Sequence, residues 1–310
     1  MVSLTKIYKN FSIKSQHKNS ILLIGNFDGL HLGHQKLFTL AKNYKKKHSL
    51  KIGVLTFEPM PKMYFNNKLK NFRISSQRQK IDILKKLNVD FVVIKKFNND
   101  FSKMKSVNFI KQVLGKKLKP KFIFVSNNFR FGNKREGDVR QLIKYENICN
   151  YKIVKPQPLL INKKIASSSL IRNYLQKSKL EKANIFLNRK WSIEGKVQKG
   201  KQLGKKIGFP TANIDIKDYV LARPGVYAVR VKRLNGLNYI KGIVNLGYRP
   251  TFNGKKILLE VHLFNFSGNL YNKYLTVEFL KFIRKEKKFK NIDQLKKQIK
   301  IDLLKAKKTK

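Results

Sequence analysis

Residues Ile21–Ile24 (ILLI) run directly into Gly25–Gln35 (GNFDGLHLGHQ), and this stretch decides the fold of the first half of the chain. Four consecutive apolar residues predict a short buried strand, and the glycine-rich turn then leads into a helix predicted over 34–44. A strand, a glycine turn and a helix in that order are typical of a parallel α/β unit, in which the helix N-terminus favours anions.

The rest of the first half repeats this alternation. Further strands are predicted at Ile52–Phe57, Phe91–Ile94 and Phe122–Val125, and further helices over 77–87 and 107–118. Such a pattern predicts a parallel sheet covered by helices, with ligands bound at the carboxyl ends of the strands.

The pattern changes after Trp191. Strands separated by turn residues are predicted over five segments: Ser192–Val197, Val226–Leu234, Tyr239–Leu246, Ile257–Phe266 and Tyr274–Phe282. They predict a small antiparallel β-barrel, followed by a C-terminal helix over 292–304. We therefore predict an α/β plus β protein. A Rossmann-like parallel-sheet domain covers residues 1–187 and ends in a helical stretch over 167–188. The barrel domain covers residues 188–310.

The composition indicates a globular protein with a large excess of positive charge. The 310 residues include 70 Lys and Arg against 17 Asp and Glu, a formal charge of +53, and 58 of the 70 basic residues are lysines spread along the whole chain. An even spread indicates composition bias rather than a nucleic-acid surface, so no specific nucleic-acid partner is expected. The single Cys149 excludes an intramolecular disulfide. No apolar run reaches the roughly 18 residues that span a bilayer, so we expect a cytoplasmic protein without a membrane partner.

Two histidines mark a candidate site in the glycine turn. His31 and His34 are three residues apart, so they can share one side of the first helical turn. Two imidazoles there can donate hydrogen bonds to the α-phosphate of a nucleotide and to departing pyrophosphate. An attacking phosphate is already ionised at neutral pH, so such a site needs positioning and charge neutralisation rather than a general base.

The same stretch resembles the nucleotidyltransferase superfamily through its His-x-Gly-His string. Thr56–Pro61 and Asn127–Asp138 are similar to the corresponding stretches of the bacterial FMN adenylyltransferases. The resemblance implies that His31 and His34 are catalytic. It also implies nucleotide or phosphate binding by a group of loop residues: Gly25, Phe27, Asp28, Gly29 and Asn128.

A serine cluster, Ser167–Arg172 (SSSLIR), begins the predicted helical stretch. Its serines can simply cap that helix. It also resembles the family's Arg-x-Ser-Ser-Thr-x-x-Arg signature, which implies that Ser168, Ser169 and Arg172 hold the phosphates of ATP.

This chain departs from the family pattern at three positions. Ile165 stands where the signature has its first arginine, Ser169 stands for the threonine, and Ser126 replaces a glycine before the Asn-Phe pair. Lys163 and Lys164 are candidates to supply the missing charge, but a lysine lacks the guanidinium fork.

A second candidate site lies in Gly195–Asn213, where Gly200, Gly204 and Gly208 recur at a spacing of four. Glycines at this spacing suit a backbone that wraps phosphates, although the stretch is not a P-loop. Its ending, Gly208–Asn213 (GFPTAN), closely resembles the riboflavin kinase family. The resemblance implies that the side chains of Thr211 and Asn213 hold Mg²⁺ and the nucleotide phosphates, and oxygen ligands suit that ion.

Four later segments are similar to the same family in the same order: Pro224–Val229, Gly242–Phe252, Leu259–Phe266 and Ile283–Glu286 with Phe289. The resemblance implies flavin binding by Asn245, Arg249 and Arg284. A ribityl hydroxyl is a poor nucleophile at neutral pH, so its phosphorylation benefits from a carboxylate base, for which Glu260 is the candidate. Strand alternation places Glu260 and His262 on one face, and the alternative is that this face is merely solvated.

The chain is thus expected to resemble bacterial bifunctional riboflavin kinase/FMN adenylyltransferases over most of its length. The resemblance implies Mg²⁺ as cofactor and small-molecule substrates. ATP would phosphorylate riboflavin to FMN, and a second ATP would adenylate FMN to FAD. Two alternatives stay open. One is a riboflavin kinase whose adenylyl half has decayed, which Ile165 suggests. The other is a nucleic-acid-binding protein on the same scaffold.

Overall fold

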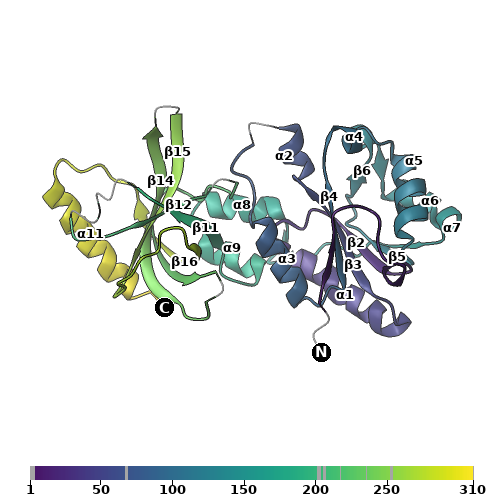
Figure 1. Cartoon of the computed structure of the whole chain (residues 1–310), viewed down its shortest axis with the longest axis horizontal. Helices are drawn as coiled ribbons and strands as arrows, with labels where there is room; N and C mark the ends of the chain where they lie inside the picture. The colour runs from purple at the N-terminus through teal and green to yellow at the C-terminus, as the bar shows by residue number, and fades with distance from the viewer. Residues whose placement is uncertain are drawn as a thin grey trace. The chain divides into compact units, whose positions relative to one another are not determined.

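A computed structural model gives the fold of the chain (Figure 1). It describes residues 4–66, 69–200, 204, 207–216, 218–234, 236–251 and 254–309, and for 249–251 and 254–256 the backbone only. The chain forms two compact units. Unit 1 contains Met1–Leu69 and Gln77–Ala166, and unit 2 contains Lys70–Ser76 and Ser167–Lys310.

Unit 1 is built on a parallel six-stranded sheet in the order β1-β4-β3-β2-β5-β8. Its strands are β1 (Lys6–Tyr8), β2 (Ile21–Ile24), β3 (Ile52–Glu58), β4 (Phe91–Lys96), β5 (Phe122–Phe124) and β8 (Lys152–Val154). The chain leaves β2 toward β3 and β4 and later returns to the other side of β2 at β5. The order therefore switches between β2 and β5, where open α/β sheets bind ligands.

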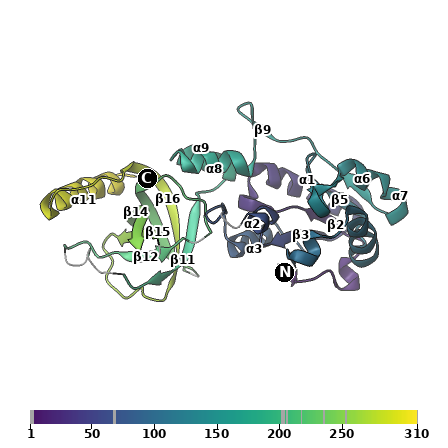
Figure 2. The ribbon, with the colours of Figure 1, turned by 90° about the horizontal axis from the view of Figure 1, so that it is seen from above.

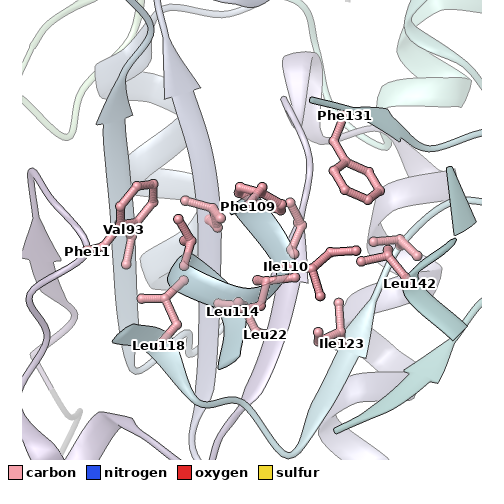
Figure 3. Packing of buried hydrophobic residues seen from close by; sticks show 14 of the residues in the cluster. Phe11, Leu22, Val93, Phe109, Ile110, Leu114, Leu118, Ile123, Phe131 and Leu142 are labelled. Atoms are coloured by element: carbon pink, nitrogen blue, oxygen red, sulfur yellow. The ribbon is translucent and has the colours of Figure 1, made fainter. Parts of the chain in front are cut away.

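Helices cover both faces of this sheet. The helices of unit 1 are α1 (Leu32–His48), α2 (Pro61–Phe65), α3 (Gln77–Lys86), α4 (Asn99–Ser102), α5 (Ser106–Asn108), α6 (Val139–Lys144) and α7 (Glu146–Cys149). Residues in β2 alternate between the two faces: Ile21 and Leu23 pack with α1 and α3, whereas Leu22 and Ile24 pack with Phe109–Leu118. Figure 3 shows Phe109, Ile110 and Leu114 against Leu22 and Ile123.

The segment η3 (Phe109–Leu118) is a π-helix, although the sequence predicts an ordinary helix over 107–118. Short elements complete the unit: the turns η1 (Ser15–His17), η2 (Asp28–Leu30) and η4 (Asn133–Arg135), and the hairpins β6 (Arg130–Phe131) with β7 (Gly137–Asp138) and β9 (Leu160–Ile161) with β10 (Lys164–Ile165). The predicted parallel sheet covered by helices is confirmed.

Unit 2 is a closed antiparallel barrel in the order β11-β12-β15-β14-β13-β16, with helices attached. The strands are β11 (Ser192–Gln198), β12 (Ala212–Asp215), β13 (Gly225–Arg233), β14 (Ile240–Thr251), β15 (Gly254–Leu263) and β16 (Tyr274–Lys285). All five predicted strands are confirmed, and β12 is added. Large side chains such as Trp191, Tyr227 and Phe279 are almost fully buried in this unit.

Three helices of unit 2 are given by the part of the chain that the structure describes: α8 (Ser168–Gln176), α9 (Leu180–Leu187) and α11 (Ile292–Lys307). The helices α8 and α9 pack together (Figure 2). The predicted helical stretch 167–188 is therefore two helices, broken where Ser178 takes a left-handed φ of 52°. Helix α11 packs through Leu303 and Ala306 on Val226, Ala228 and Ile243 of the barrel's outer face. In the described part of the chain, no helix is long and apolar enough to cross a membrane.

Candidate functional sites

The glycine turn after β2 brings the two predicted histidines together. His31 is the N-cap of α1 and His34 lies in its first turn, and their rings stack with centroids 3.7 Å apart at 22°. The turn itself is strained, because the non-glycine residues Phe27 and Leu30 have φ angles of 48° and 40°. Backbone strain of this kind is concentrated at functional sites. The prediction that the two imidazoles share one side of the helix is confirmed.

Gly33 lies between the two histidines, where the Ala166 carbonyl and the His31 ring come too close to leave room for a side chain. A Cβ atom there would lie 2.8 Å from the carbonyl oxygen of Ala166 and 3.1 Å from the His31 ring. The first distance is shorter than a Cβ atom tolerates and the second is tight, so a larger residue would displace the chain at Ala166 and press on the His31 ring. The glycine of the His-x-Gly-His string therefore serves the geometry of the histidine pair.

The histidine pair has an unusual electrostatic environment. Burial, then the charge of a protonated His31 and then the Lys80 ammonium hold the pKa of His34 well below its usual value. His34 is thus neutral at pH 7 and keeps one N–H to donate. Its buried Nδ1 atom has no hydrogen-bond partner among the residues that the structure describes. A phosphate oxygen is the kind of ligand that such a ring can bind.

The other predicted loop residues fall into two groups. Gly25 and Gly29 form the turn, and the Asp28 side chain is buried beside them. Phe27 is also buried, and its ring packs edge-on against the His34 ring with the two ring centroids 5.2 Å apart, so it supports the histidine. Asn128, after β5, is exposed and accepts a hydrogen bond from the Ser126 hydroxyl at 2.9 Å. The serine that departs from the family pattern therefore orients this asparagine.

An aromatic pocket in unit 1 was missed by the sequence predictions. Its lining combines cationic side chains at Arg130, Lys134 and Arg135 with seven phenylalanines: Phe57, Phe65, Phe97, Phe101, Phe109, Phe129 and Phe131. The rings of Phe129 and Phe131 stack at 5.5 Å. Phe57 lies at the end of β3, Phe97 follows β4 and Phe129 follows β5, so the pocket lies at the carboxyl edge of the sheet. The recurrence of phenylalanine at or soon after the ends of these strands is the signal that could have indicated it.

The serine cluster belongs to unit 2. Ser167 is the N-cap of α8 and its hydroxyl accepts from the Leu170 N–H at 3.3 Å, so the predicted cap is confirmed. Ser168 and Ser169 open the first turn, and Arg172 donates from Nε to the Phe72 carbonyl at 2.8 Å. Their phosphate-binding role stays a prediction.

The positions around Ile165 lie in the small β9–β10 hairpin of unit 1. Ile165 pairs with Leu160, and its side chain is 55% exposed. Lys163 sits in the hairpin turn with a φ of 60°. An exposed isoleucine at this position offers no charge to a phosphate.

A row of polar side chains on three neighbouring strands forms the second site. Glu260 of β15 pairs directly with Asn213 of β12 on one side and Asn245 of β14 on the other. Directly paired residues point to the same face of a sheet. Leu259 and Val261 are almost fully buried inside the barrel, so Glu260 lies on its outer face. The predicted strand alternation around Glu260 is confirmed.

The glycine-rich loop approaches this row. A Cβ atom at Gly200 would collide with the Asn213 side-chain amide, so the loop backbone lies directly on Asn213. Near Thr211, the backbone of Gly204 packs on the Phe209 carbonyl, and Gly208 turns the chain with a φ of 87°. Residues 201–203 and 205–206 of the predicted loop lie outside the described residues.

Two residues, His262 and Glu286, join the site although no role in it was predicted for them. His262 Nδ1 donates a hydrogen bond to the Pro210 carbonyl oxygen at 2.8 Å and so fixes the loop beside Thr211. Glu286 lies against Gly247, and burial, followed by the charge of Glu260, raises its pKa, while Arg284 lowers it. Two carboxylates therefore face this site. The Arg-x-Glu spacing of Arg284 and Glu286, at the end of β16, was the available signal.

The predicted flavin-binding residues have different surroundings. Asn245 lies in the polar row. Arg284 is tied to Asp302 of α11, with Nη2 2.7 Å and Nε 2.8 Å from the carboxylate. The side chain of Arg249 lies outside the described residues. Flavin binding by all three stays a prediction.

The side-chain oxygens of Thr211 and Asn213 are suitable ligands for a magnesium ion. A hydroxyl and an amide oxygen are hard ligands, and Mg²⁺ in phosphate-transferring sites takes few protein ligands besides the substrate phosphates. Of the residues described, no group of three or more His, Cys, Asp or Glu side chains is placed to hold a metal.

Comparison with known proteins finds two family models that match successive parts of the chain. Residues 13–170 match the family model of FAD synthetase, and residues 187–310 match that of riboflavin kinase. Three curated proteins, each named bifunctional riboflavin kinase/FMN adenylyltransferase, are similar over nearly the whole chain. The protein of Buchnera aphidicola (subspecies Schizaphis graminum) is 39% identical over 94% of both chains. That of Haemophilus influenzae is 39% identical over 92% of both chains, and that of Escherichia coli K12 is 36% identical over 94% of this chain and 93% of the relative.

A solved structure shares the fold. The crystal structure of a Streptococcus pneumoniae protein, described as a macrolide-efflux protein, has a TM-score of 0.83 and 26% identity, and the match covers 99% of each chain.

Proposed function

The chain belongs to the family of bifunctional riboflavin kinases/FMN adenylyltransferases, and we propose that it converts riboflavin to FAD in two ATP-dependent steps. The first step phosphorylates riboflavin to FMN and releases ADP. The second transfers AMP from ATP to FMN and releases pyrophosphate. We assign the adenylyl step to residues 1–187 and the kinase step to residues 188–310.

The kinase assignment is carried by the position of Glu260. The ribityl 5′-hydroxyl attacks the γ-phosphorus of ATP, its proton passes to the Glu260 carboxylate, and ADP leaves. Asn213 and Asn245 flank Glu260 on neighbouring strands, so a nucleotide held at Asn213 and a flavin held at Asn245 would meet at the base. Gly200 and His262 hold the loop that presents Asn213 and Thr211.

Magnesium completes this proposal. Thr211 and Asn213 would hold Mg²⁺ together with the ATP phosphates, and the ion would neutralise charge on the transferred phosphoryl group. The close packing of Gly200 on Asn213 supports this assignment, because it fixes the amide beside the loop backbone. Loop N–H groups would then share the phosphates with the ion.

The adenylyl assignment is supported by the stacked histidine pair, in which His34 is neutral, and by the aromatic pocket. The FMN phosphate attacks the α-phosphorus of ATP, and the pyrophosphate leaves. His31 and His34 donate hydrogen bonds to the phosphate oxygens as charge develops. The phenylalanine-lined pocket suits a flat aromatic ring such as the flavin, and Arg130, Lys134 and Arg135 suit its phosphate.

One assay distinguishes this proposal from its alternatives. The purified chain receives ATP and Mg²⁺ with riboflavin or with FMN, and flavins are separated by chromatography. FAD from both substrates is expected. FMN without FAD would indicate a kinase with a decayed adenylyl half, in line with Ile165. Neither product, with binding to random DNA that survives physiological salt, would indicate the nucleic-acid-binding alternative.

Variants test the residues. Glu260→Gln should still bind riboflavin but lose FMN formation by about 100-fold or more, because the base is removed. His34→Ala should lose FAD formation from FMN and keep kinase turnover. Near-normal FMN formation by Glu260→Gln would refute its role as the base.

A further inference from the structure

A buried lysine lies beside the histidine pair. Lys80, on α3, is only 2% exposed, and its Nζ atom is 3.4 Å from the Thr56 hydroxyl oxygen. Thr56 stands near the carboxyl end of β3 and is itself 2% exposed. Its hydroxyl is 3.4 Å from the Asn26 carbonyl oxygen, in the glycine turn. Lys80, Thr56 and Asn26 therefore form a chain of polar contacts that ends in the phosphate-binding loop.

The helix that carries Lys80 also touches this loop. Helix α3 packs against η2, the segment that contains Asp28 and Gly29. The charge of the Lys80 ammonium also reaches His34, where it adds to burial and His31 in lowering the pKa of the imidazole. Lys80 thus contacts the loop through Thr56, and its positive charge acts electrostatically on His34.

Burial of an ammonium group is expensive. Lysine is among the residues least often fully buried, because the charge loses its water. A methionine or leucine would fill the same volume on α3 without that cost. In a water-poor site, however, a fixed charge acts far more strongly on a developing negative charge than it would in solvent. A lysine at this position makes physical sense if the site handles negative charge.

We propose that Lys80 is a positioning residue for adenylyl transfer: its buried ammonium anchors the glycine turn through Thr56 and Asn26 and supplies fixed positive charge beside the His31–His34 pair. This inference rests on the proposed adenylyl transfer at that pair. The charge stabilises the negative charge that develops as pyrophosphate leaves. It also adds to burial and His31 in keeping His34 neutral, so that the imidazole N–H remains a hydrogen-bond donor.

The test compares Lys80→Met with Lys85→Met in the full chain. Lys85 lies on the same helix and is exposed, so it is a matched control. Lys80→Met should lower kcat for FAD formation from FMN by about 10-fold or more, because a preorganised charge is lost. The KM for FMN should change little, and riboflavin kinase turnover in the same molecule should stay at the wild-type value. Lys80→Arg should recover part of the loss.

A spectroscopic measurement separates this role from a merely structural one. The titration of the His34 ring, followed by NMR of its carbon-bound protons, should move to higher pH in Lys80→Met and stay in place in Lys85→Met. Wild-type kcat with an unmoved His34 titration would overturn the proposal. If Lys80→Met does not fold, Thr56→Val decides: a several-fold loss of FAD formation supports the anchor, and a wild-type rate overturns it.

The proposed function is checked separately with His34→Ala. If that variant still makes FAD at the wild-type rate, the histidine site itself is wrong. If His34→Ala is inactive while Lys80→Met is normal, only the inference about Lys80 fails.

Discussion

The guanidinium carbon of Arg172 lies 3.6 Å from the centre of the Phe72 ring, and Arg172 Nε donates to the Phe72 carbonyl. One residue thus holds the arginine by its ring and by its backbone. Phe72 stands 100 positions earlier in the chain, between α2 and α3, yet it belongs to the same unit as Arg172. The orientation of a predicted phosphate ligand therefore depends on a distant segment.

Removing the ring should weaken ATP use in the adenylyl step. A cation–π contact contributes about 0.5–2 kcal/mol, which corresponds to about a 2- to 30-fold effect. We expect Phe72→Ala to raise the KM for ATP in FAD formation within that range and Phe72→Tyr to behave like the wild type. Steady-state kinetics with FMN as substrate would measure both. An unchanged KM for ATP in Phe72→Ala would show that the stacking does not prepare Arg172 for phosphate.

The contact between Gly200 and Asn213 leads to a second prediction. Gly200→Ala places a methyl group where the Asn213 amide lies, so the amide must move. Misplacement of a ligand by about 1 Å can cost about 100-fold in rate, and we expect riboflavin phosphorylation to fall by about 10- to 100-fold. FAD formation from added FMN should be unaffected. Gly236→Ala, in the turn after β13, is the control and should retain full kinase turnover.

The ion pair between Arg284 and Asp302 should dominate the stability of the barrel's helix. Asp302 is 2% exposed, and Gln298 adds a hydrogen bond to it at 3.0 Å. Loss of one partner of a buried pair costs about 3–5 kcal/mol, and the lower end applies because the Arg284 side chain is 21% exposed. Asp302→Asn should therefore lower the free energy of unfolding by about 3 kcal/mol.

The only tryptophan reports on this unit directly. Trp191 is buried in unit 2, so urea unfolding followed by its fluorescence isolates the barrel. The Asp302→Asn variant should also need more riboflavin for half-maximal rate if Arg284 binds flavin. Identical unfolding midpoints for variant and wild type would contradict the importance of the pair.

His17 predicts a pH-dependent stability of unit 1. It is 5% exposed, its Nδ1 lies 2.7 Å from the Tyr8 hydroxyl, and its ring stacks on Phe91. Burial, followed by the charge of Lys51, lowers its pKa. The folded state then binds fewer protons than the unfolded state. The contribution of neutral His17 to the stability of the folded state is complete above the pKa of the unfolded state, about 6.5. It is lost as the pH falls below that value toward the lower pKa of the folded state.

Thermal unfolding of unit 1 at pH 7.5 and pH 5.5 would measure this effect. The wild type should lose more stability between the two conditions than His17→Phe does, even if the variant is less stable at both. Because His34 contributes with the same sign, the comparison between variant and wild type isolates His17. Equal losses in the two proteins would exclude a role for His17.

The sequence was informative where local pattern and tertiary environment agree. Buried β2 and the alternating β15 have the periodicities of their final positions, so both were predicted. The short edge strand β1 was missed because three residues among lysines carry too little pattern. The strand β12 was missed because Pro210 and Thr211 precede it and its residues read as part of the phosphate loop.

Features that depend on distant contacts could not be predicted. Nothing near Phe72 indicates Arg172 as its partner, and the lysine at position 80 reads as one surface charge among many until its burial is seen. The histidine pair was predicted from its spacing, from the glycine turn between strand and helix, and from the family resemblance. The lowered pKa of His34 was not predicted, because it arises from burial, from the charge of His31 and from Lys80.

The segment Lys70–Ser76 has a consequence for dividing the protein. It lies early in the sequence but is built into unit 2, where its Ile74 carbonyl accepts the indole N–H of Trp191 at 2.9 Å and Arg73 exchanges backbone hydrogen bonds with residues 218 and 220. A gene fragment that starts at residue 188 would leave the indole N–H without this acceptor. No single cut of the polypeptide therefore releases an intact unit 2. A separate kinase domain made from this chain would need the seven-residue segment Lys70–Ser76 added as a peptide or joined through a new linker.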